Sequence, residues 1–192
     1  MTWMQYAGVP YEIGSNVARG VTVKDIAHSL ARINRFTGHT RHFISVARHS
    51  VFVSTLLDFR PQAAMYGLIH DVHESVTNDI SYPIKRALSD AARRELEVIA
   101  DNADTALYEV LGVEWPMPPD IKLLVKEADN VATMTEKRDL MPDCPRKWDM
   151  LKEQPCHKGA DPTVTPRDDE GLFIARYYEL AKHLGIMPKI WS

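Results

Sequence analysis

The sequence predicts an all-α fold, and three observations lead to this prediction. Apolar residues recur at helical spacing through most of the 192-residue chain. Strand-like alternation of apolar and polar residues is nearly absent. Proline and glycine stand where helices would begin or end. Because 192 residues suit one domain and 45% of them are hydrophobic, we expect a single domain, a compact helical bundle with a sizeable core.

The first predicted helix covers residues 22–34. Thr22 is its expected N-cap, and Asp25 follows three residues later, as in a weak capping box. Its apolar positions follow helical spacing. The next residues, RFTGHT, are expected to form a loop marked by Gly38.

The second and third predicted helices cover residues 42–59 and 61–76. Pro61 stands near the first turn of the third helix, where a missing N–H costs nothing. A turn region that ends at Pro83 follows it. The expected apolar stripe of the second helix consists of Phe43, Val46, Val53 and Leu57.

The second half of the chain predicts three more helices. A long amphipathic helix covers 90–112 and ends at Gly112, and a second covers 121–141. Residues 143–166 hold four prolines and little periodicity, which predicts a long loop or lid before the last helix. That last helix covers 171–185.

Charge and composition exclude several classes of partner. The formal net charge is −3, so no global basic field favours nucleic acid. The first residues lack the pattern of a secretion signal, and no apolar run approaches membrane-spanning length. We therefore expect a soluble cytoplasmic protein whose two cysteines, Cys144 and Cys156, are reduced. Any anionic substrate needs a local basic cluster.

The stretch LIHDVHES, Leu68–Ser75, places several ionisable residues within an apolar helical pattern. Their burial would cost several kcal/mol unless they are paired. His49 falls on or beside the apolar stripe of the second helix, and Asp129 stands beside apolar residues of the fifth. Three helices thus direct an imidazole or a carboxylate toward the interior.

Two histidines and two aspartates form a mixed nitrogen and oxygen ligand set. Such a set suits a divalent ion such as Zn, Mn, Co or Fe, and Mg is possible with oxygen ligands. Plainer interpretations stay open on the residues alone. His49 could be a hydrogen-bonded core histidine, and Asp129 a surface charge near Lys126.

Together these residues resemble the HD-domain phosphohydrolases, whose pattern is H…HD…D. The pattern here is His49, His70-Asp71 and Asp129. The blocks DIAHSLARINRFTGHT, FISVARHSV, LIHDVHESVTNDISYPIKR and KEADNVATMTEKRDLMP extend the likeness over about residues 20 to 142. They are similar to the small phage and bacterial members that act on nucleotides, which include deoxyribonucleoside 5′-monophosphatases and phage dATP triphosphohydrolases.

The resemblance implies a role for each polar residue of the pattern. His49, His70, Asp71 and Asp129 would hold one metal ion, which could be Zn, Co, Mn or Mg. Glu74 would hold the attacking water. Asp79 would protonate or orient the leaving ester oxygen, although Asp is also ordinary in a turn such as TNDIS.

The resemblance also implies substrate contacts. Arg35 and Lys85 would bind phosphate, and Phe36 and Pro83 would flank the base or sugar. Lys85 and its neighbour Arg86 could instead form a solvated face, and Phe36 and Pro83 could simply pack. Glu136 and Arg138 are expected to form an ion pair that braces their helix.

The implied function is metal-dependent hydrolysis of a deoxynucleotide. A dNTP triphosphohydrolase of the dATP type would release nucleoside and tripolyphosphate, and a dNMP 5′-nucleotidase would release nucleoside and phosphate. Alternatives are a cyclic-nucleotide or alarmone phosphohydrolase, a non-catalytic nucleotide-binding module that needs a metal, and a structural helical adaptor. Relatives are often homo-oligomers, which we also expect here, in the host cytoplasm if a phage encodes the chain.

Overall fold

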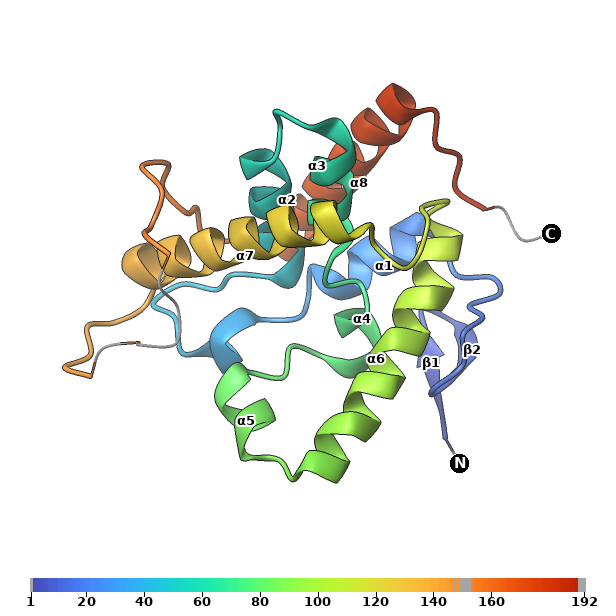
Figure 1. Cartoon of the computed structure of the whole chain (residues 1–192), viewed down its shortest axis with the longest axis horizontal. Coiled ribbons are helices and arrows are strands. Elements are labelled where there is room, and N and C mark those ends of the chain that lie inside the picture. The colour runs from blue at the N-terminus through green and yellow to red at the C-terminus, as the bar shows by residue number, and fades with distance from the viewer. Residues whose placement is uncertain (1, 147, 149–152, 190–192) are drawn as a thin grey trace.

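The structure is a computed structural model that describes residues 2–146, 148 and 153–189 (Figure 1). It confirms the all-α prediction, since a two-stranded hairpin is the sheet of the described residues. The hairpin consists of β1 (Trp3–Tyr6) and β2 (Val9–Glu12). The helices are α1 (Val23–Leu30), the 3₁₀ turn η1 (Arg35–Gly38), α2 (Val46–Leu56), α3 (Pro61–Ile69), α4 (Glu74–Thr77), α5 (Tyr82–Ala87), α6 (Asp90–Val110), α7 (Pro119–Leu140) and α8 (Pro166–Leu184).

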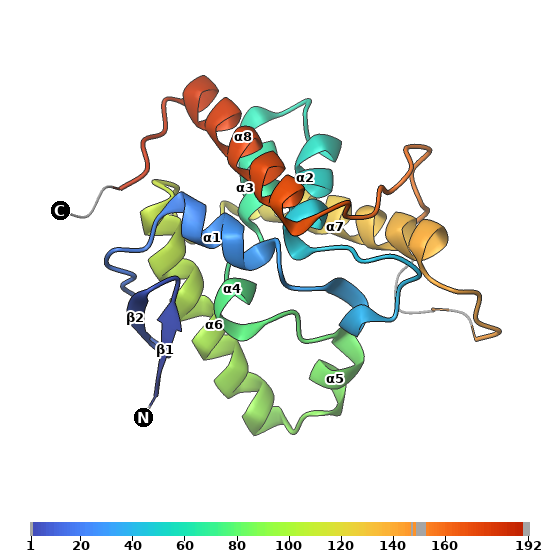
Figure 2. The ribbon, with the colours of Figure 1, turned by 180° about the vertical axis from the view of Figure 1, so that it is seen from behind.

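Helix α3 lies at the centre of the fold. Each of its residues from Ala63 to Ile69 is buried, as expected for a helix that is apolar on every side. Helices α2, α7 and α8 pack against it. Seen from behind, α8 lies in front of α3 and α2, and α1 packs alongside it (Figure 2). This packing brings α2, α3 and α7 into mutual contact, and the predicted ligands lie on α2, on α7 and directly after α3.

Helix α2 begins later than the sequence predicts. Ser45 is extended, and its hydroxyl accepts a hydrogen bond from the Arg48 N–H, so it caps the helix at Val46. Phe43 precedes this cap and is 37% exposed, so its place in the apolar stripe was wrong. Val46, Val53 and Leu57 are buried as predicted.

The predicted helix 61–76 is interrupted. Helix α3 ends at Ile69, a tight turn covers His70 to His73, and α4 begins at Glu74. The N–H groups of Val72, Glu74 and Ser75 each bond the carbonyl three residues earlier, which is 3₁₀ rather than α geometry. The imidazole Nδ1 of His70 bonds the Gly67 carbonyl at 2.8 Å, so a side chain satisfies a carbonyl in the last turn of α3 that lacks a helical partner. The HD pair therefore lies at a helix end.

Two other local predictions need correction. The hairpin was missed, because its strands have four residues each and its turn is Ala7-Gly8 rather than Asn-Gly. Both turn residues have positive φ, +47° and +95°, as a two-residue hairpin loop requires. The predicted turn region is shorter than expected: residues 78–81 are neither helix nor strand, and the short helix α5 begins at Tyr82 with Pro83 in its first turn.

Residues 143–166 hold neither helix nor strand in their described part, up to the start of α8. Their role as a lid stays a prediction; residues 147 and 149–152 lie outside the described residues. Three backbone N–H groups tie the segment down: Cys156 to the Thr135 hydroxyl, Ala160 to Asp139, and Thr163 to the Phe43 carbonyl. Cys144 and Cys156 are free thiols.

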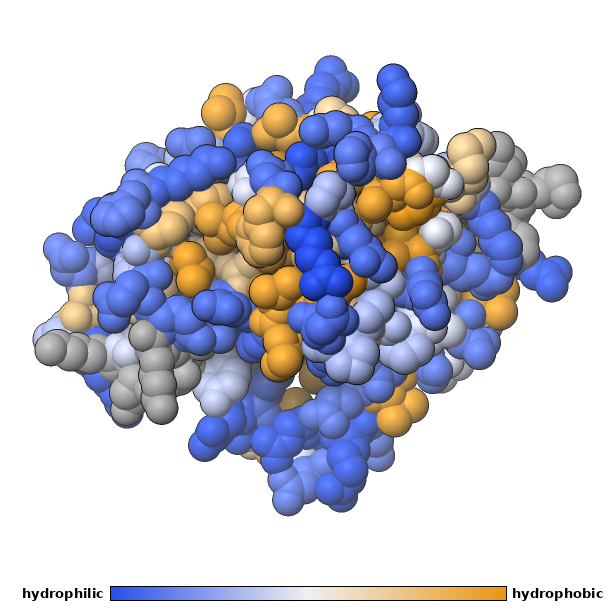
Figure 3. Space-filling view, turned by 45° about the horizontal axis from the view of Figure 1, so that its top comes forward, coloured by the Kyte–Doolittle hydropathy of each residue, from blue (hydrophilic) through white to orange (hydrophobic). Residues whose placement is uncertain are grey.

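The face that Figure 3 shows is mostly hydrophilic, with hydrophobic patches among the polar residues. Large exposed apolar side chains include Phe59 and Leu123. Among the helices of the described part, none combines the length and apolar character that a membrane span needs.

Candidate metal centre

The four predicted ligands come from three elements and converge. His49 lies on α2, His70 and Asp71 lie in the turn after α3, and Asp129 lies on α7. Ligand atoms of His49, His70 and Asp71 lie within 4.8 Å of one another. Asp129 Oδ1 lies 3.2 Å from His49 Nε2 and 3.9 Å from His70 Nε2. These groups could hold a metal ion.

The Nδ1 atom of each histidine is occupied by an acceptor. His70 Nδ1 lies 2.8 Å from the Gly67 carbonyl, which can only accept, so this nitrogen carries a proton. His49 Nδ1 lies 2.8 Å from Glu136 Oε1. Burial alone would raise the pKa of Glu136, but Arg35 and His49 lower it, so the carboxylate is ionised and His49 Nδ1 is also the donor. The lone pair of each neutral imidazole is therefore on Nε2.

Both Nε2 atoms face carboxylates without a hydrogen bond. Asp71 Oδ2 lies 3.1 Å from His70 Nε2, yet the two Nε2 atoms are buried and unpartnered within the described structure. A lone pair this close to a carboxylate is repelled unless a cation lies between them. A divalent ion between them removes the repulsion and accepts both Nε2 lone pairs, so the residues present fit a metal.

Without a metal, a proton takes the place of the cation. Burial and Arg35 lower the pKa of His49, but Glu136 and Asp129 outweigh them and raise it to about 9. The same arrangement that attracts this proton would attract a metal ion in its place.

Glu136 is the main residue that sequence analysis assigned wrongly. It does not pair with Arg138, which instead bonds its neighbour Asp139. Glu136 is fully buried and binds His49 through Oε1 and the Arg35 guanidinium through Oε2, at 3.0 Å. It thus joins a predicted metal ligand to a predicted phosphate contact. Glu136 comes seven residues after Asp129, so the two side chains lie on the same face of α7. This spacing is the sequence signal from which the place of Glu136 beside the centre could have been predicted.

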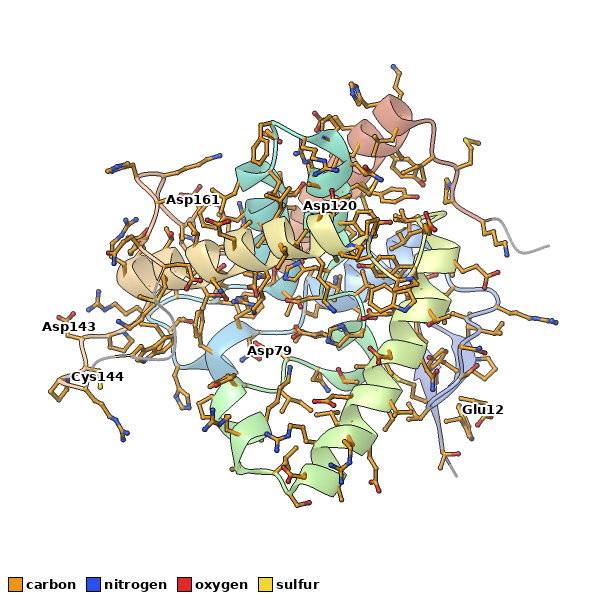
Figure 4. All side chains as sticks on the ribbon, in the orientation of Figure 1. Glu12, Asp79, Asp120, Asp143, Cys144 and Asp161 are labelled. Atoms are coloured by element: carbon orange, nitrogen blue, oxygen red, sulfur yellow. The ribbon has the colours of Figure 1, made fainter. Side chains whose placement is uncertain are left out.

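Glu74 and Asp79, the predicted catalytic pair, lie beside the centre. Glu74 is buried, and burial together with Asp71 and Asp79 raises its pKa well above the ordinary value. Asp79 lies in the loop between α4 and α5, near the middle of Figure 4. Burial also raises the pKa of Asp79, while Arg35 lowers it.

The predicted substrate residues surround this pair unevenly. Lys85 on α5 lies close enough to lower the pKa of both Glu74 and Asp79. Arg86 instead donates a hydrogen bond to the Tyr82 hydroxyl at 3.1 Å, on the exposed surface of α5. The Arg35 guanidinium is buried against Glu136 and Thr133. Its contact with phosphate stays a prediction.

The two predicted flanking residues differ in their surroundings. The Phe36 ring lies 6.0 Å from that of Trp148, centroid to centroid, and is half-buried. Pro83 is exposed in the first turn of α5. Their contact with a base or sugar remains a prediction.

Comparison with known proteins gives the chain a family. The Escherichia coli K12 protein YfdR, described as uncharacterized, is 35% identical over 164 residues, which cover 84% of this chain and 85% of YfdR. The chain belongs to the YfdR family. An uncharacterized protein of Rhodobacter capsulatus is 26% identical over 180 residues, 85% of this chain and 87% of its own length. No family model matches the chain. Similarity to YfdR covers most of both proteins, so we expect YfdR to share this fold.

Proposed function

We propose that this protein is a metal-dependent phosphohydrolase that cleaves a deoxynucleotide between its 5′ oxygen and phosphorus. The observation that carries the proposal is the pair of buried Nε2 atoms, of His49 and His70, that face Asp71 and Asp129 without a hydrogen bond in the described structure. The resemblance to HD-domain phosphohydrolases includes the same four residues, and we propose that wider family for the chain.

His49, His70, Asp71 and Asp129 would hold the metal, with Zn, Co, Mn and Mg as candidates. A divalent ion bound there lowers the pKa of water or polarises a phosphoryl oxygen. The chain's own contribution is orientation: Glu136 and the Gly67 carbonyl fix the two imidazoles through Nδ1, so both Nε2 atoms stay aimed inward.

We propose that Glu74 activates the attacking water. A carboxylate with a raised pKa accepts a proton more readily near neutral pH than an ordinary glutamate does. In the proposed reaction, the water oxygen forms a bond to phosphorus and its proton passes to Glu74. The bond from phosphorus to the 5′ oxygen breaks, and Asp79, whose raised pKa favours the protonated acid, gives its proton to that oxygen.

The cations around the pair fit a phosphate. Lys85 lies near Glu74 and Asp79, and Arg35 lies near Asp79, so a phosphoryl group beside them would meet positive charge. We propose a deoxynucleoside triphosphate of the dATP type as the first substrate class, released as nucleoside and tripolyphosphate. A deoxynucleoside 5′-monophosphate is the second class.

A product panel tests the proposal. Metal-free protein is incubated with each dNMP and dNTP in the presence of Co²⁺, Mn²⁺, Zn²⁺ or Mg²⁺, and the products are separated by chromatography. Nucleoside with tripolyphosphate identifies a triphosphohydrolase, and nucleoside with inorganic phosphate identifies a 5′-nucleotidase.

Two results would overturn the proposal. If no nucleotide reacts with any metal, the protein is not a deoxynucleotide hydrolase. If the same incubations with cyclic nucleotides or alarmones in place of the deoxynucleotides give products instead, a phosphohydrolase remains but the substrate class is wrong. Asp71→Ala, which removes a ligand, is the negative control in each arm.

A further inference from the structure

We infer that the chain has a second ligand site, outside the candidate metal centre, and that its ligand is a small aliphatic monocarboxylate. A cavity of about 150 Å³ lies between one face of α2 and residues 158–161 of the segment before α8. The lining side chains of α2 stand at positions i, i+3, i+4 and i+7, which share one helix face: Arg48, Val51, Phe52 and Thr55. None of the proposed metal ligands lines this cavity.

Arg48 offers the cavity fixed donors. Its Nε atom donates a hydrogen bond to Asp169 Oδ1 at 2.8 Å, and Asp169 is fully buried. The other oxygen of Asp169 accepts from the hydroxyls of Ser45 and Thr163, so the carboxylate that positions Arg48 is itself fixed. The two terminal nitrogens of Arg48 bond no group in the described part of the chain. Together they form the fork that binds a carboxylate through two parallel hydrogen bonds.

The charges of the lining side chains match a monoanion. Arg48 and Lys158 are positive and Asp161, labelled in Figure 4, is negative, which leaves one positive charge in excess. Glu136 also lines the cavity, but its charge is matched by Arg35, which it binds on its other side. A monocarboxylate balances this excess, whereas a phosphate dianion exceeds it and a cation adds to it.

The rest of the wall favours an apolar ligand body of small size. Ile44, Val51 and Phe52 line the cavity with aliphatic and aromatic carbon. Aliphatic carbon that leaves water to contact these side chains gains free energy, which a fully hydrated inorganic anion does not. Pockets for drug-sized ligands hold about 300–1,000 Å³, so this cavity suits a smaller molecule than the proposed nucleotide.

The wall that residues 158–161 form is held in place on both sides. The Cys156 N–H bonds the Thr135 hydroxyl at 3.0 Å, and the Ala160 N–H bonds Asp139 at 2.8 Å. A preformed wall loses little conformational entropy when a ligand binds. The inference is independent of the proposed hydrolysis, since none of the residues proposed to bind metal or nucleotide lines the cavity.

Nuclear magnetic resonance of the ¹⁵N-labelled full chain tests the site. Butyrate is titrated into the protein, and in parallel butyramide, which keeps the shape of butyrate without its charge, and inorganic phosphate. We expect saturable shifts of the Val51 and Gly159 amides with butyrate. Butyramide and phosphate should bind there at least about 10-fold more weakly, because the first lacks the charge for Arg48 and the second lacks the apolar body.

Two variants assign the charges of the site. Arg48→Lys keeps a positive charge for Asp169 but loses the fork, and it should weaken butyrate binding about 10-fold. Lys158→Gln alters an exposed side chain and should weaken binding about 2- to 5-fold, the range of exposed charge pairs. Arg32→Lys is the matched control, because Arg32 also binds a carboxylate of α8, Glu170, but does not line the cavity. It should bind butyrate as the unaltered chain does.

The inference fails if butyrate causes no saturable shift at Val51 and Gly159, or if butyramide or phosphate binds there as tightly as butyrate. It also fails if Arg48→Lys and Lys158→Gln both bind butyrate as the unaltered chain does. Circular dichroism verifies that each variant is folded, and Lys158→Gln decides the matter if Arg48→Lys is not. Butyrate binding without hydrolysis of any nucleotide supports this site and refutes the proposed function, and the reverse result refutes this site alone.

Discussion

At the scale of single residues, Glu136 connects the two halves of the proposed chemistry. One of its oxygens holds His49, a proposed metal ligand, and the other holds Arg35, all within the buried interior. The negative charge of Glu136 holds the Arg35 guanidinium and the His49 imidazole in place, and all three groups are shielded from solvent. A neutral side chain in place of Glu136 could accept a strong hydrogen bond from His49 or from Arg35, but not from both.

We therefore expect Glu136→Gln to weaken metal binding about 10- to 100-fold. The amide oxygen can still accept from His49 Nδ1, but its N–H groups would face the Arg35 donors. Competition with a coloured chelator measures the loss.

Glu170→Gln is the matched control, because Glu170 on α8 also binds one histidine and one arginine, His28 and Arg32, neither of which is a proposed ligand or phosphate contact. Its metal affinity should equal that of the unaltered chain. Equal losses in both variants would contradict the special role of Glu136.

The residue scale also shows why partners were harder to predict than ligands. His49, His70, Asp71 and Asp129 stand out in the sequence because they are ionisable residues at buried positions of predicted helices. Glu136 and His49 are 87 residues apart. A side chain's partner at that distance depends on how two helices pack, which spacing within one helix does not reveal.

At the scale of elements, Gly67 sets how closely α3 approaches α2. A Cβ atom there would lie 2.9 Å from Leu57 Cδ1 and 3.4 Å from the Ser54 Cα. The approach matters because His49 on α2 and His70 after α3 must lie side by side, with ring centroids 5.4 Å apart.

Gly67→Ala should therefore destabilise the fold by about 1–3 kcal/mol, the usual cost of overpacking, and should also weaken metal binding. Urea unfolding and chelator competition measure the two effects.

Gly171→Ala is the control, since Gly171 is also helical but has no neighbouring atom within 4 Å of an added Cβ. It should leave metal binding unchanged and stabilise α8 by up to about 1 kcal/mol. If Gly67→Ala is as stable as the unaltered chain, the close approach is not required.

Element boundaries follow the sequence only where a local signal fixes them. The capping box of Thr22 and Asp25 and the end of α6 before Gly112 are as predicted. The break after Ile69 was not, since helical and 3₁₀ turns use the same residue types and differ by a fraction of a residue per turn. No sequence pattern predicts that the His70 side chain bonds the Gly67 carbonyl in the last turn of α3.

At the scale of the whole molecule, the candidate centre joins α2, the turn after α3, and α7, which come from distant parts of the chain. A metal held by all three binds only the folded state. Such an ion stabilises the fold by about 2.7 kcal/mol when its free concentration is a hundred times its Kd.

Removal of metal by a chelator should thus lower the Tm by roughly 5–10 °C for a chain of this size. Calorimetry with and without Mn²⁺ measures the shift. Asp71→Ala, which lacks a ligand, should show no response to Mn²⁺, and a response as large as that of the unaltered chain would refute the ligand assignment.

The most direct measurement follows hydrolysis as metal is returned to metal-free protein. Mn²⁺ is added stepwise to the stripped chain with dATP or dAMP present, and nucleoside release is plotted against bound ions. We predict no nucleoside before metal is added, and release that rises as the site of His49, His70, Asp71 and Asp129 fills. Release that is equal in stripped protein, or absent at full occupancy with either nucleotide, would contradict a metal-dependent deoxynucleotide hydrolase.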